Sequence, residues 1–311
     1  MSRKRGVTVG IGFIGLGTMG RPVAENLLTA GHDLIVHDVM SAAVDEMVEL
    51  GASAAGSVQD LARNAGVVFL SLPGPAEIDA VVMGIDGVRQ HAAEGTIIVD
   101  LSTSSVAAVR SVASACDAAG LHYVDAPVSG GAVGARAGTL SILVGTDDDE
   151  VFATIEPLLQ AFGRNIVRAG GVGGGTLLKL INNQVFLSAT VLVQEAFVFG
   201  AKAGLSSDEI KAVLDHSTAG VITRNTGFVL NRDFNAQVFK LSIATKDLAL
   251  SLESAEALAV SMPMTEAAHS MFQQAVEAGY GDQAFYSTVR RLEDLAGAEV
   301  APLSPLIKED E

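Results

Sequence analysis

A lysine and two asparagines lie within an otherwise apolar segment near the middle of the chain. Residues 173–184 read GGGTLLKLINNQ, and after Lys179 no charged residue occurs before Glu195. Lys179 and Asn183 are four residues apart, so on a helix they share one face. An amine can exchange a proton with a hydroxyl group, and an amide can orient that hydroxyl or a carbonyl. The pair predicts proton transfer at Lys179 with Asn183 beside it; the alternative is a lysine that reaches solvent as an ordinary charge.

A Ser-Gly-Gly turn is the second feature that could do chemistry. It lies in DAPVSGGAVGARAGTL (125–140) and consists of Ser129, Gly130 and Gly131. One hydroxyl and unobstructed backbone N–H groups are suited to holding a carboxylate, although a plain turn has the same composition. Lys246 and Asp247 form a third candidate pair, for which an exposed surface ion pair is the stronger interpretation.

The fingerprint Gly15-x-Gly17-x-x-Gly20 follows an apolar strand pattern and precedes a helical one. In such a motif the first glycine allows a tight turn, the second lets a pyrophosphate approach the backbone, and the third lets the helix pack closely. The helix N-terminus then supplies donors to the phosphates. We therefore predict a dinucleotide site in this loop, which also contains Leu16, Thr18 and Met19.

Asp38 ends the second strand pattern and bears on the choice of cofactor. A carboxylate there accepts hydrogen bonds from the adenosine ribose and repels a 2'-phosphate. No Lys or Arg occurs from Asp33 to Ala62 to offset that repulsion. NAD is therefore the expected cofactor, with NADP possible.

Two further loops follow strand patterns, at 70–74 (LSLPG) and 100–105 (DLSTSS). Ligands bind beyond the carboxyl ends of the strands in parallel sheets, so we expect these loops to lie on the nicotinamide side. The serines at 104 and 105 also suit a helix cap, and the two roles are compatible. The residues expected to contact the cofactor here are Leu72, Pro73 and Thr103.

The kind of secondary structure that the sequence predicts around these residues changes near residue 172. Before it, short apolar strands alternate with helical patterns; after it, only helical patterns of period 3.6 occur. This order predicts an α/β Rossmann-type, doubly wound, mainly parallel sheet followed by an all-α second domain. The expected domains are 1–172 and 173–300, joined by a long helix buried between them, with a frayed tail at 301–311. The expected strands are Val7–Ile14, Leu34–His37, Val67–Leu72, Thr96–Asp100, Leu121–Asp125, Leu140–Val144 and Asn165–Val167. The expected helices are Met19–Ala30, Ala42–Leu50, Ala107–Ala119, Asp149–Phe162, Thr176–Ala203, Ser207–His216, Ile243–Val260, Met264–Ala278 and Phe285–Leu295.

Composition excludes several classes of function. With 36 acidic and 20 basic residues among 311, the net charge of -16 disfavours nucleic acid and anionic membranes as partners. The single cysteine, Cys116, rules out an internal disulfide and a cysteine-based zinc cluster, and we expect an inert, packed thiol and no metal. The basic, then apolar, N-terminus resembles a signal peptide, but its glycines favour a strand and loop. The uncharged stretch 180–194 is short and polar for a bilayer span, so we expect a cytoplasmic protein.

Five motifs in order resemble the β-hydroxyacid dehydrogenase family, whose members include 3-hydroxyisobutyrate dehydrogenase and tartronate semialdehyde reductase. They are GFIGLGTMGRPVAENLLTAGH, DLSTSS, DAPVSGGAVGARAGTL, GGVGGGTLLKLINNQ and KDLAL, spread over most of the chain. The resemblance implies hydride transfer between a nicotinamide cofactor and a small β-hydroxy acid or its semialdehyde. It further implies a homodimer or homotetramer formed through the helical domains.

The resemblance also assigns roles to residues. Lys179 matches the catalytic general acid/base, and Asn183 matches a residue that positions the substrate. Ser129, Gly130 and Gly131 match the turn that holds the substrate carboxylate, which places Ser129 and Asn183 in the catalytic group as well. Lys246 matches a lysine near the nicotinamide, and the segment from Gly12 to Asn26 matches cofactor-binding positions.

Four alternatives remain at this level. A reductase of a larger aldehyde acid, similar to succinic semialdehyde, fits the same motifs. An imine reductase fits less well because such relatives typically lack the lysine, and a 6-phosphogluconate dehydrogenase needs a longer helical domain. A non-catalytic cofactor-binding module fits least. Substrate selectivity is expected around 216–225 and Phe234–Lys240, where Arg224 or Lys240 would suit a second carboxylate unless they are surface cations.

Overall fold

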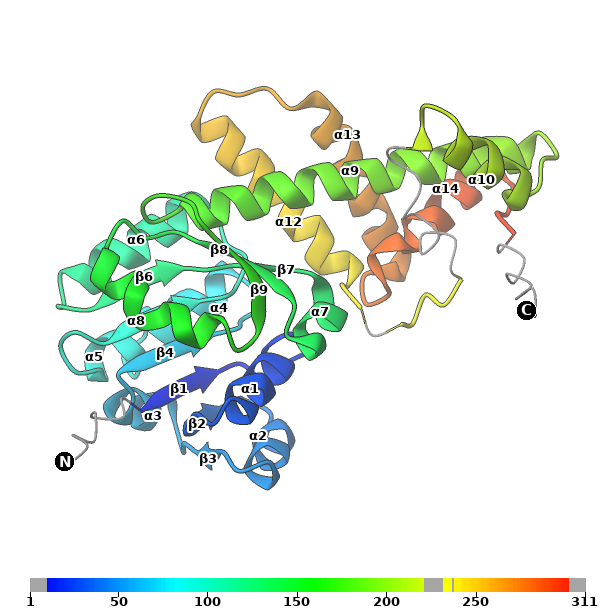
Figure 1. The fold of residues 1–311 in the computed structure, drawn as a ribbon. Helices are drawn as coiled ribbons and strands as arrows, with labels where there is room; N and C mark the ends of the chain where they lie inside the picture. Colours follow the sequence, from blue (N-terminus) through cyan, green and yellow to red (C-terminus); the bar gives the residue numbers. More distant parts are fainter. Residues whose placement is uncertain (1–9, 221–231, 237, 302–311) are drawn as a thin grey trace. The chain divides into compact units, whose positions relative to one another are not determined.

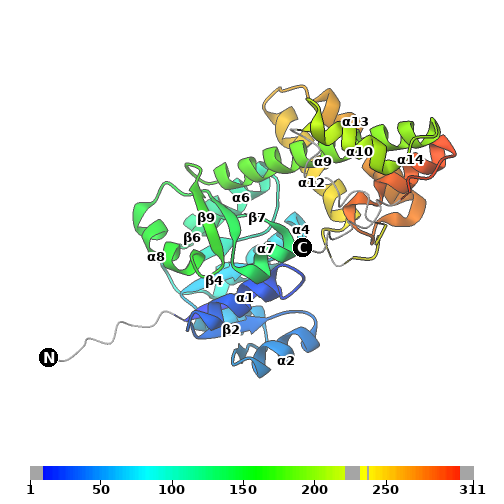
Figure 2. The same ribbon diagram turned by 45° about the vertical axis from the view of Figure 1, so that its right-hand side comes forward.

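The chain forms two compact units, Met1–Leu180 and Ile181–Glu311. The computed structural model describes residues 10–220, 232–236 and 238–301. The division falls within α9 (Gly174–Lys202), a single continuous helix of 29 residues (Figures 1 and 2). The boundary expected at residue 172 lies just before this helix begins.

A six-stranded parallel sheet forms the centre of the first unit and confirms the expected fold class. Its order is β3-β2-β1-β4-β5-β6, so the chain reverses direction across the sheet between β3 and β4, beside β1. All six carboxyl ends lie at one edge, because every pairing is parallel. The strands are β1 (Ile11–Ile14), β2 (Leu34–His37), β3 (Ser53–Ala54), β4 (Val67–Leu70), β5 (Ile97–Asp100) and β6 (His122–Asp125).

The remaining strands of this unit form a separate small sheet. β7 (Val128–Ser129) pairs antiparallel with β8 (Leu140–Val144), which pairs parallel with β9 (Gly163–Arg168). The backbone of Asp125 at the end of β6 forms an isolated bridge with Gly145 after β8. The two sheets are therefore joined at the edge where the strands of the large sheet end.

Helices cover both faces of the large sheet. Successive strand residues point to opposite faces, and Phe13 and Phe69 belong to one buried cluster while Ile14 and Leu70 belong to another. Ser57, Ser105 and Asp148 cap their helices through side-chain oxygens. The helices are α1 (Gly20–Thr29), α2 (Ser41–Glu49), α3 (Val58–Asn64), α4 (Pro75–Met83), α5 (Val88–His91), α6 (Val106–Asp117), α7 (Gly131–Ala137) and α8 (Asp149–Leu159).

The second unit is helical over its described residues, as expected. Its core includes Leu187 and Phe197 of α9 together with Leu248, Phe272 and Tyr286. The expected helix at 264–278 runs from α13 into the segment Val276–Tyr280, where Gly279 adopts φ +91° and breaks the helical geometry with a kink. Besides α9 the unit contains α10 (Ser207–His216), α12 (Leu241–Ala257), α13 (Pro263–Ala275), the π-helix Val276–Tyr280, the 3-10 helix Phe285–Ser287 and α14 (Thr288–Ala296).

α9 has unusual length and apolar character. Among the helices in the described ranges it alone is long and apolar enough to cross a membrane, with mean hydropathy 1.4 in its most apolar window. Leu187, Val191 and Phe197 are nevertheless buried in the core of the second unit. One face of α9 is therefore a core face, although only 44% of the apolar window is buried.

Two smaller expectations concern Cys116 and the C-terminal tail. Cys116 is fully buried on α6, and burial raises the pKa of its thiol to about 11, which fits an inert thiol. Most of the tail expected at 301–311 lies outside the described residues. The carbonyl of Ala301 accepts a hydrogen bond from Ser207 Oγ at 2.6 Å, so the chain is held against α10 up to that point.

Candidate active site

The glycine loop between β1 and α1 has the shape that the fingerprint predicts. Gly15 adopts φ +95°, and a Cβ added there would lie 2.3 Å from the Ser71 carbonyl oxygen. A Cβ added at Gly20 would lie 1.9 Å from the Gly15 carbonyl oxygen, so α1 can start only at a glycine. At Gly17 an added Cβ would meet nothing within 4 Å. The loop thus leaves open space above Gly17, which fits the pyrophosphate of a dinucleotide.

Asp38 lies directly beside this loop at the end of β2. Its Oδ2 accepts a hydrogen bond from Leu16 N–H at 2.6 Å, and its Oδ1 accepts one from Met40 N–H at 2.8 Å. The nearest basic residue of the fingerprint, Arg21, is engaged elsewhere, because it pairs with Glu25 at 2.8 Å and also with Glu46. The loop is therefore flanked by an oriented carboxylate, and the guanidinium of Arg21 is paired with two glutamates.

A buried hydrogen-bond network supports the loops after β4 and β5. Leu72 N–H donates to Ser102 Oγ at 2.8 Å, and Ser102 N–H donates to Asp100 Oδ1 at 2.9 Å. Tyr123 Oη–H donates to Asp100 Oδ2 at 2.5 Å from the neighbouring strand β6. Burial, with Asp100 beside it, raises the pKa of Tyr123 well above its usual range, so the hydroxyl stays a donor. Sequence reasoning missed Asp100 and Tyr123, whose only signal was their position near strand ends.

The other residues expected near the nicotinamide lie in the same two loops. Pro73 is exposed and Thr103 is half-buried. Ser105 Oγ accepts a hydrogen bond from Ala108 N–H at 3.2 Å, so the helix-cap role of this segment is confirmed.

The Ser-Gly-Gly turn requires glycine at both of its later positions. Gly130 adopts φ +128° and Gly131 φ +61°, which side chains disfavour. Ser129 ends β7, directly before the two glycines, and is half-buried. The turn leads into α7, which is tied to α1 because Asn26 Nδ2 donates to the Ala135 carbonyl at 2.7 Å. The turn and the glycine loop are therefore held in one unit.

Lys179 is half-buried near the start of α9. The first turn of this helix is anchored by the buried carboxylate of Asp125 at the end of β6. Oδ1 accepts a hydrogen bond from Gly173 N–H at 2.8 Å, and Oδ2 accepts one from Thr176 N–H at 2.7 Å. Burial raises the pKa of Asp125 to about 6, against the opposing effect of these backbone hydrogen bonds. Sequence reasoning assigned Asp125 no role.

Asn183 lies one turn beyond Lys179 on the same helix and is 3% exposed. Its Nδ2 donates to Asp247 Oδ2 at 2.6 Å, and its Oδ1 accepts from Asn182 Nδ2 at 3.0 Å. Lys246 Nζ lies 3.0 Å from Asp247 Oδ1. Asp247 is 1% exposed, so the interpretation of this pair as a surface ion pair was wrong. Asn182, the second asparagine of the segment, is exposed, and its donated hydrogen bond helps to orient the amide of Asn183.

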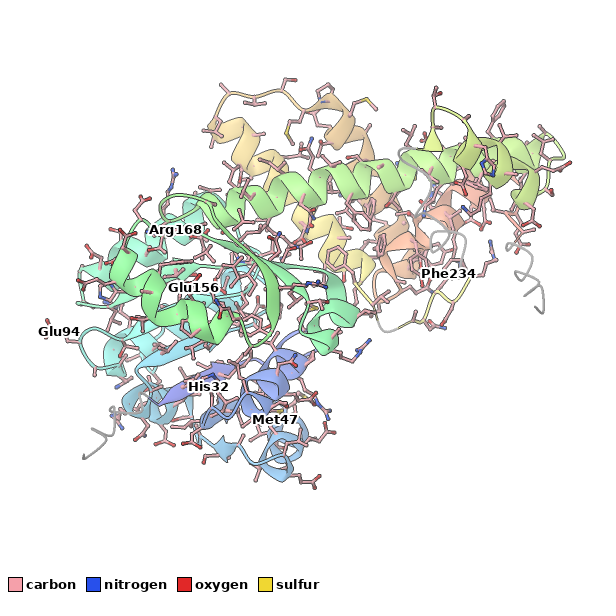
Figure 3. The ribbon with its side chains drawn as sticks, viewed as in Figure 1. His32, Met47, Glu94, Glu156, Arg168 and Phe234 are labelled. Atoms are coloured by element: carbon pink, nitrogen blue, oxygen red, sulfur yellow. The ribbon has the colours of Figure 1, made fainter. Side chains whose placement is uncertain are left out.

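The segments expected to select the substrate are partly described. Positions 221–225, including Arg224, lie outside the described residues. Lys240 pairs with Asp282 at 3.0 Å at the surface, where both side chains are more than half exposed. Phe234, labelled in Figure 3, has the guanidinium groups of Arg232 and Arg290 at 5.1 and 5.4 Å from its ring centroid. Over the described ranges, no group of three or more His, Cys, Asp or Glu side chains is placed to hold a metal ion.

Two family models together match nearly the whole described chain. Residues 10–171 match the NAD binding domain of 6-phosphogluconate dehydrogenase. Residues 173–292 match the domain described as NAD-binding of NADP-dependent 3-hydroxyisobutyrate dehydrogenase.

Individual relatives align with this chain over almost their full length. The chain is 38% identical over 293 residues to NAD-dependent L-serine dehydrogenase of Pseudomonas aeruginosa, covering 91% of this chain and 97% of the relative. It is 35% identical to 2-(hydroxymethyl)glutarate dehydrogenase of Eubacterium barkeri, with 94% and 98% covered. Among solved structures, 3-hydroxyisobutyrate dehydrogenase of Mycobacterium tuberculosis with L-serine matches with a TM-score of 0.82 and 28% identity, covering 92% and 99%.

Proposed function

The chain belongs to the β-hydroxyacid dehydrogenase family of nicotinamide-dependent oxidoreductases, and we propose that it interconverts a small β-hydroxy acid and its semialdehyde. One observation carries this proposal. The first unit alone contains the open glycine loop, the Ser129–Gly131 turn and Lys179, all held at the edge where the sheet strands end. A cofactor site, a carboxylate-binding turn and a proton-transfer group are what this reaction requires.

NAD is the cofactor that these residues fit best. The pyrophosphate would be held by the loop Gly15–Gly20, and the adenosine ribose by Asp38. Leu72, Pro73 and Thr103 would line the nicotinamide side, to which the family resemblance also assigns Lys246. When bound, NAD accepts the hydride in oxidation, and NADH supplies it in reduction. NADP stays possible, but Asp38 would meet its 2'-phosphate with a negative charge.

Lys179 carries the proton. In oxidation its neutral amine takes the proton from the substrate hydroxyl oxygen, and in reduction its ammonium returns a proton to the same oxygen. Lys179 is half-buried near the start of α9, which limits the contact of its side chain with water. Among the residues named here, Lys179 is the one whose removal stops proton transfer.

Ser129, Gly130, Gly131 and Asn183 orient the substrate. The hydroxyl of Ser129 and the backbone N–H groups of the two glycines would hold the carboxylate. The amide of Asn183 would direct the reacting hydroxyl, and its orientation is already set by Asn182 and Asp247. Fixing both ends of a small hydroxy acid leaves one hydroxyl for Lys179.

Homodimer formation through α9 is part of the proposal. Val185, Leu192 and Phe199 are spaced seven residues apart on α9 and are 62, 53 and 78% exposed. Apolar residues at this spacing form one stripe that a second copy of the helix can cover. The double variant Leu192→Glu/Phe199→Glu should be monomeric by light scattering; wild-type protein that is itself monomeric would contradict dimer formation. A cytoplasmic location is proposed as well, in keeping with the single, buried cysteine.

A screen of NAD reduction tests the proposed function. The panel is 3-hydroxyisobutyrate, glycerate, 3-hydroxypropionate, L-serine and threonate, with 4-hydroxybutyrate and 2-(hydroxymethyl)glutarate as the longer acids. We expect kcat/KM to be highest for one of the β-hydroxy acids. A maximum at 4-hydroxybutyrate would favour the reductase of a larger aldehyde acid. No NAD reduction with any of these acids, in either direction of the reaction, would contradict the proposal.

A further inference from the structure

The carboxylate of Asp125 caps α9 from a distant strand. It accepts hydrogen bonds from Gly173 N–H, just before the helix, and from Thr176 N–H, the third helical residue. These are donors that a helix leaves unsatisfied at its start. A residue directly before a helix normally supplies such a cap, whereas Asp125 lies 48 residues before Gly173. The cap therefore fixes the helix to the sheet as well as satisfying its N–H groups.

Glycines leave the space that this contact needs. A Cβ added at Gly145 would lie 2.2 Å from Asp125 Oδ1. A Cβ added at Gly175 would lie 2.0 Å from the Leu143 carbonyl oxygen and 2.8 Å from that of Asp125. Gly145 N–H also donates to the Asp125 carbonyl at 2.7 Å. A side chain at Gly145 would therefore have to displace the buried carboxylate, and one at Gly175 would have to displace the backbone of β8 or β6.

Both neighbours of this contact belong to the proposed active site. Lys179 follows Thr176 by three residues, less than one helical turn along α9. Ser129 follows Asp125 by four residues along the chain. We infer that Asp125 is a positioning residue, whose carboxylate sets the place of Lys179 relative to the Ser129–Gly131 turn by holding the first turn of α9 against the end of β6. This inference rests on the proposed function, because the proposed function is what assigns proton transfer to Lys179.

The two hydrogen bonds restrain the helix in the ways that matter for Lys179. Because one carboxylate accepts hydrogen bonds from both Gly173 and Thr176, sliding of the first turn of α9 along its axis or rotation about it would break at least one of them. Misplacing a reacting group by about 1 Å can cost roughly 100-fold in rate. Binding of cofactor and of the substrate carboxylate uses other residues, so it is not expected to depend on Asp125.

Steady-state kinetics of Asp125→Ala separate this role from simple stabilisation. We expect kcat to fall about 10- to 100-fold while the substrate KM and the NADH dissociation constant change less than about 3-fold. Amide hydrogen exchange of residues 173–179 should become faster, which is measured without any turnover. A residue that only stabilises the fold would lower the melting temperature and leave kcat of the folded enzyme unchanged.

Gly145→Ala is a second variant that disturbs the contact without removing the carboxylate. Gly145 does not adopt a positive φ, so alanine is allowed there by the backbone, and its methyl group must push the carboxylate aside. Gly56→Ala is the matched control, because an added Cβ at Gly56 meets nothing within 4 Å. We expect Gly145→Ala to lower kcat about 10-fold and Gly56→Ala to leave it unchanged.

A double-mutant cycle completes the test. If Gly145 acts through Asp125, Gly145→Ala lowers kcat no further in the Asp125→Ala background. Wild-type kcat in folded Asp125→Ala, or fully multiplicative effects of the two changes, would overturn the inference. Failure of the proposed function has a different signature, namely wild-type enzyme that transfers no hydride to or from any acid of the panel.

Discussion

Asp100 and Asp125 are register partners at the ends of the adjacent parallel strands β5 and β6, and each supports a different part of the site. Asp100 binds Ser102 N–H and Tyr123 Oη–H beneath the cofactor loops. Asp125 binds Gly173 and Thr176 at the start of the helix that carries Lys179. Two buried carboxylates at the ends of neighbouring strands thus hold two separate segments, the loops after β4 and β5 and the start of α9.

Removing the Asp38 carboxylate should weaken the preference for NADH. In the proposed complex this group accepts hydrogen bonds from the ribose, and a hydrogen bond to a charged group contributes about 1.5–3 kcal/mol. We expect Asp38→Ala to lower kcat/KM for NADH about 10- to 100-fold and to reduce the ratio of NADH to NADPH efficiency. Asp45→Ala, an exposed change on α2, is the control and should leave both values unchanged. A wild-type enzyme with a larger kcat/KM for NADPH would contradict the assignment.

Tyr123→Phe should destabilise the first unit and loosen the cofactor loops. The change deletes the hydrogen bond that Tyr123 donates to the buried carboxylate of Asp100, at a cost of about 1–3 kcal/mol. Because Asp100 also holds Ser102 and through it Leu72, the NADH dissociation constant should rise several-fold in a fluorescence titration. Tyr280→Phe is the matched control, since its hydroxyl contacts Asp294 at 3.4 Å at the surface. Equal effects of Tyr123→Phe and Tyr280→Phe on the NADH dissociation constant would contradict a role of the Asp100 hydrogen bonds in supporting the cofactor loops.

The pH dependence of stability should report on Asp125. Its folded pKa of about 6 lies above the ordinary 3.8, so between these values the folded protein binds the proton more tightly than the unfolded chain. Its contribution to the free energy of unfolding therefore falls as the pH rises through this window, by up to about 3 kcal/mol. Urea unfolding of wild type and Asp125→Asn from pH 4 to 7 measures the difference. The prediction would be wrong if the free energy of unfolding of the wild type rose relative to that of Asp125→Asn as the pH rises.

Much of the architecture could be predicted from the sequence because its signals are local. Strand–helix alternation and the glycine fingerprint predicted the parallel sheet, the cofactor loop and the long helix at 174–202. The helices at 58–64, 75–83, 88–91 and 131–137 and the two-residue strands β3 and β7 were missed. All but the nine-residue helix at 75–83 carry too few residues to show a hydrophobic period.

The support of the site could not be predicted, because it depends on contacts between distant residues. Asp125 meets Thr176 from 51 positions away, and Asn183 meets Asp247 from 64 positions away. The sequence marked Lys179 and Asn183 by contrast with their apolar neighbours, whereas nothing local distinguishes Asp125 from any acidic residue at a strand end. The sequence therefore indicated the candidate residues, whereas the carboxylates that orient them could be identified only from the structure.

The central claim is that Lys179 exchanges the proton, and Lys179→Ala tests it most directly. General acid–base catalysis contributes about 100- to 10,000-fold, so kcat with the best acid of the panel should fall by at least about 100-fold. NADH binding should change less than about 2-fold, because the cofactor loop is untouched. Lys202→Ala is the control on the same helix, since its Nζ donates to the Gly297 carbonyl at the surface, and its kcat should match wild type. A Lys179→Ala enzyme that keeps more than about a tenth of the wild-type kcat would contradict the account.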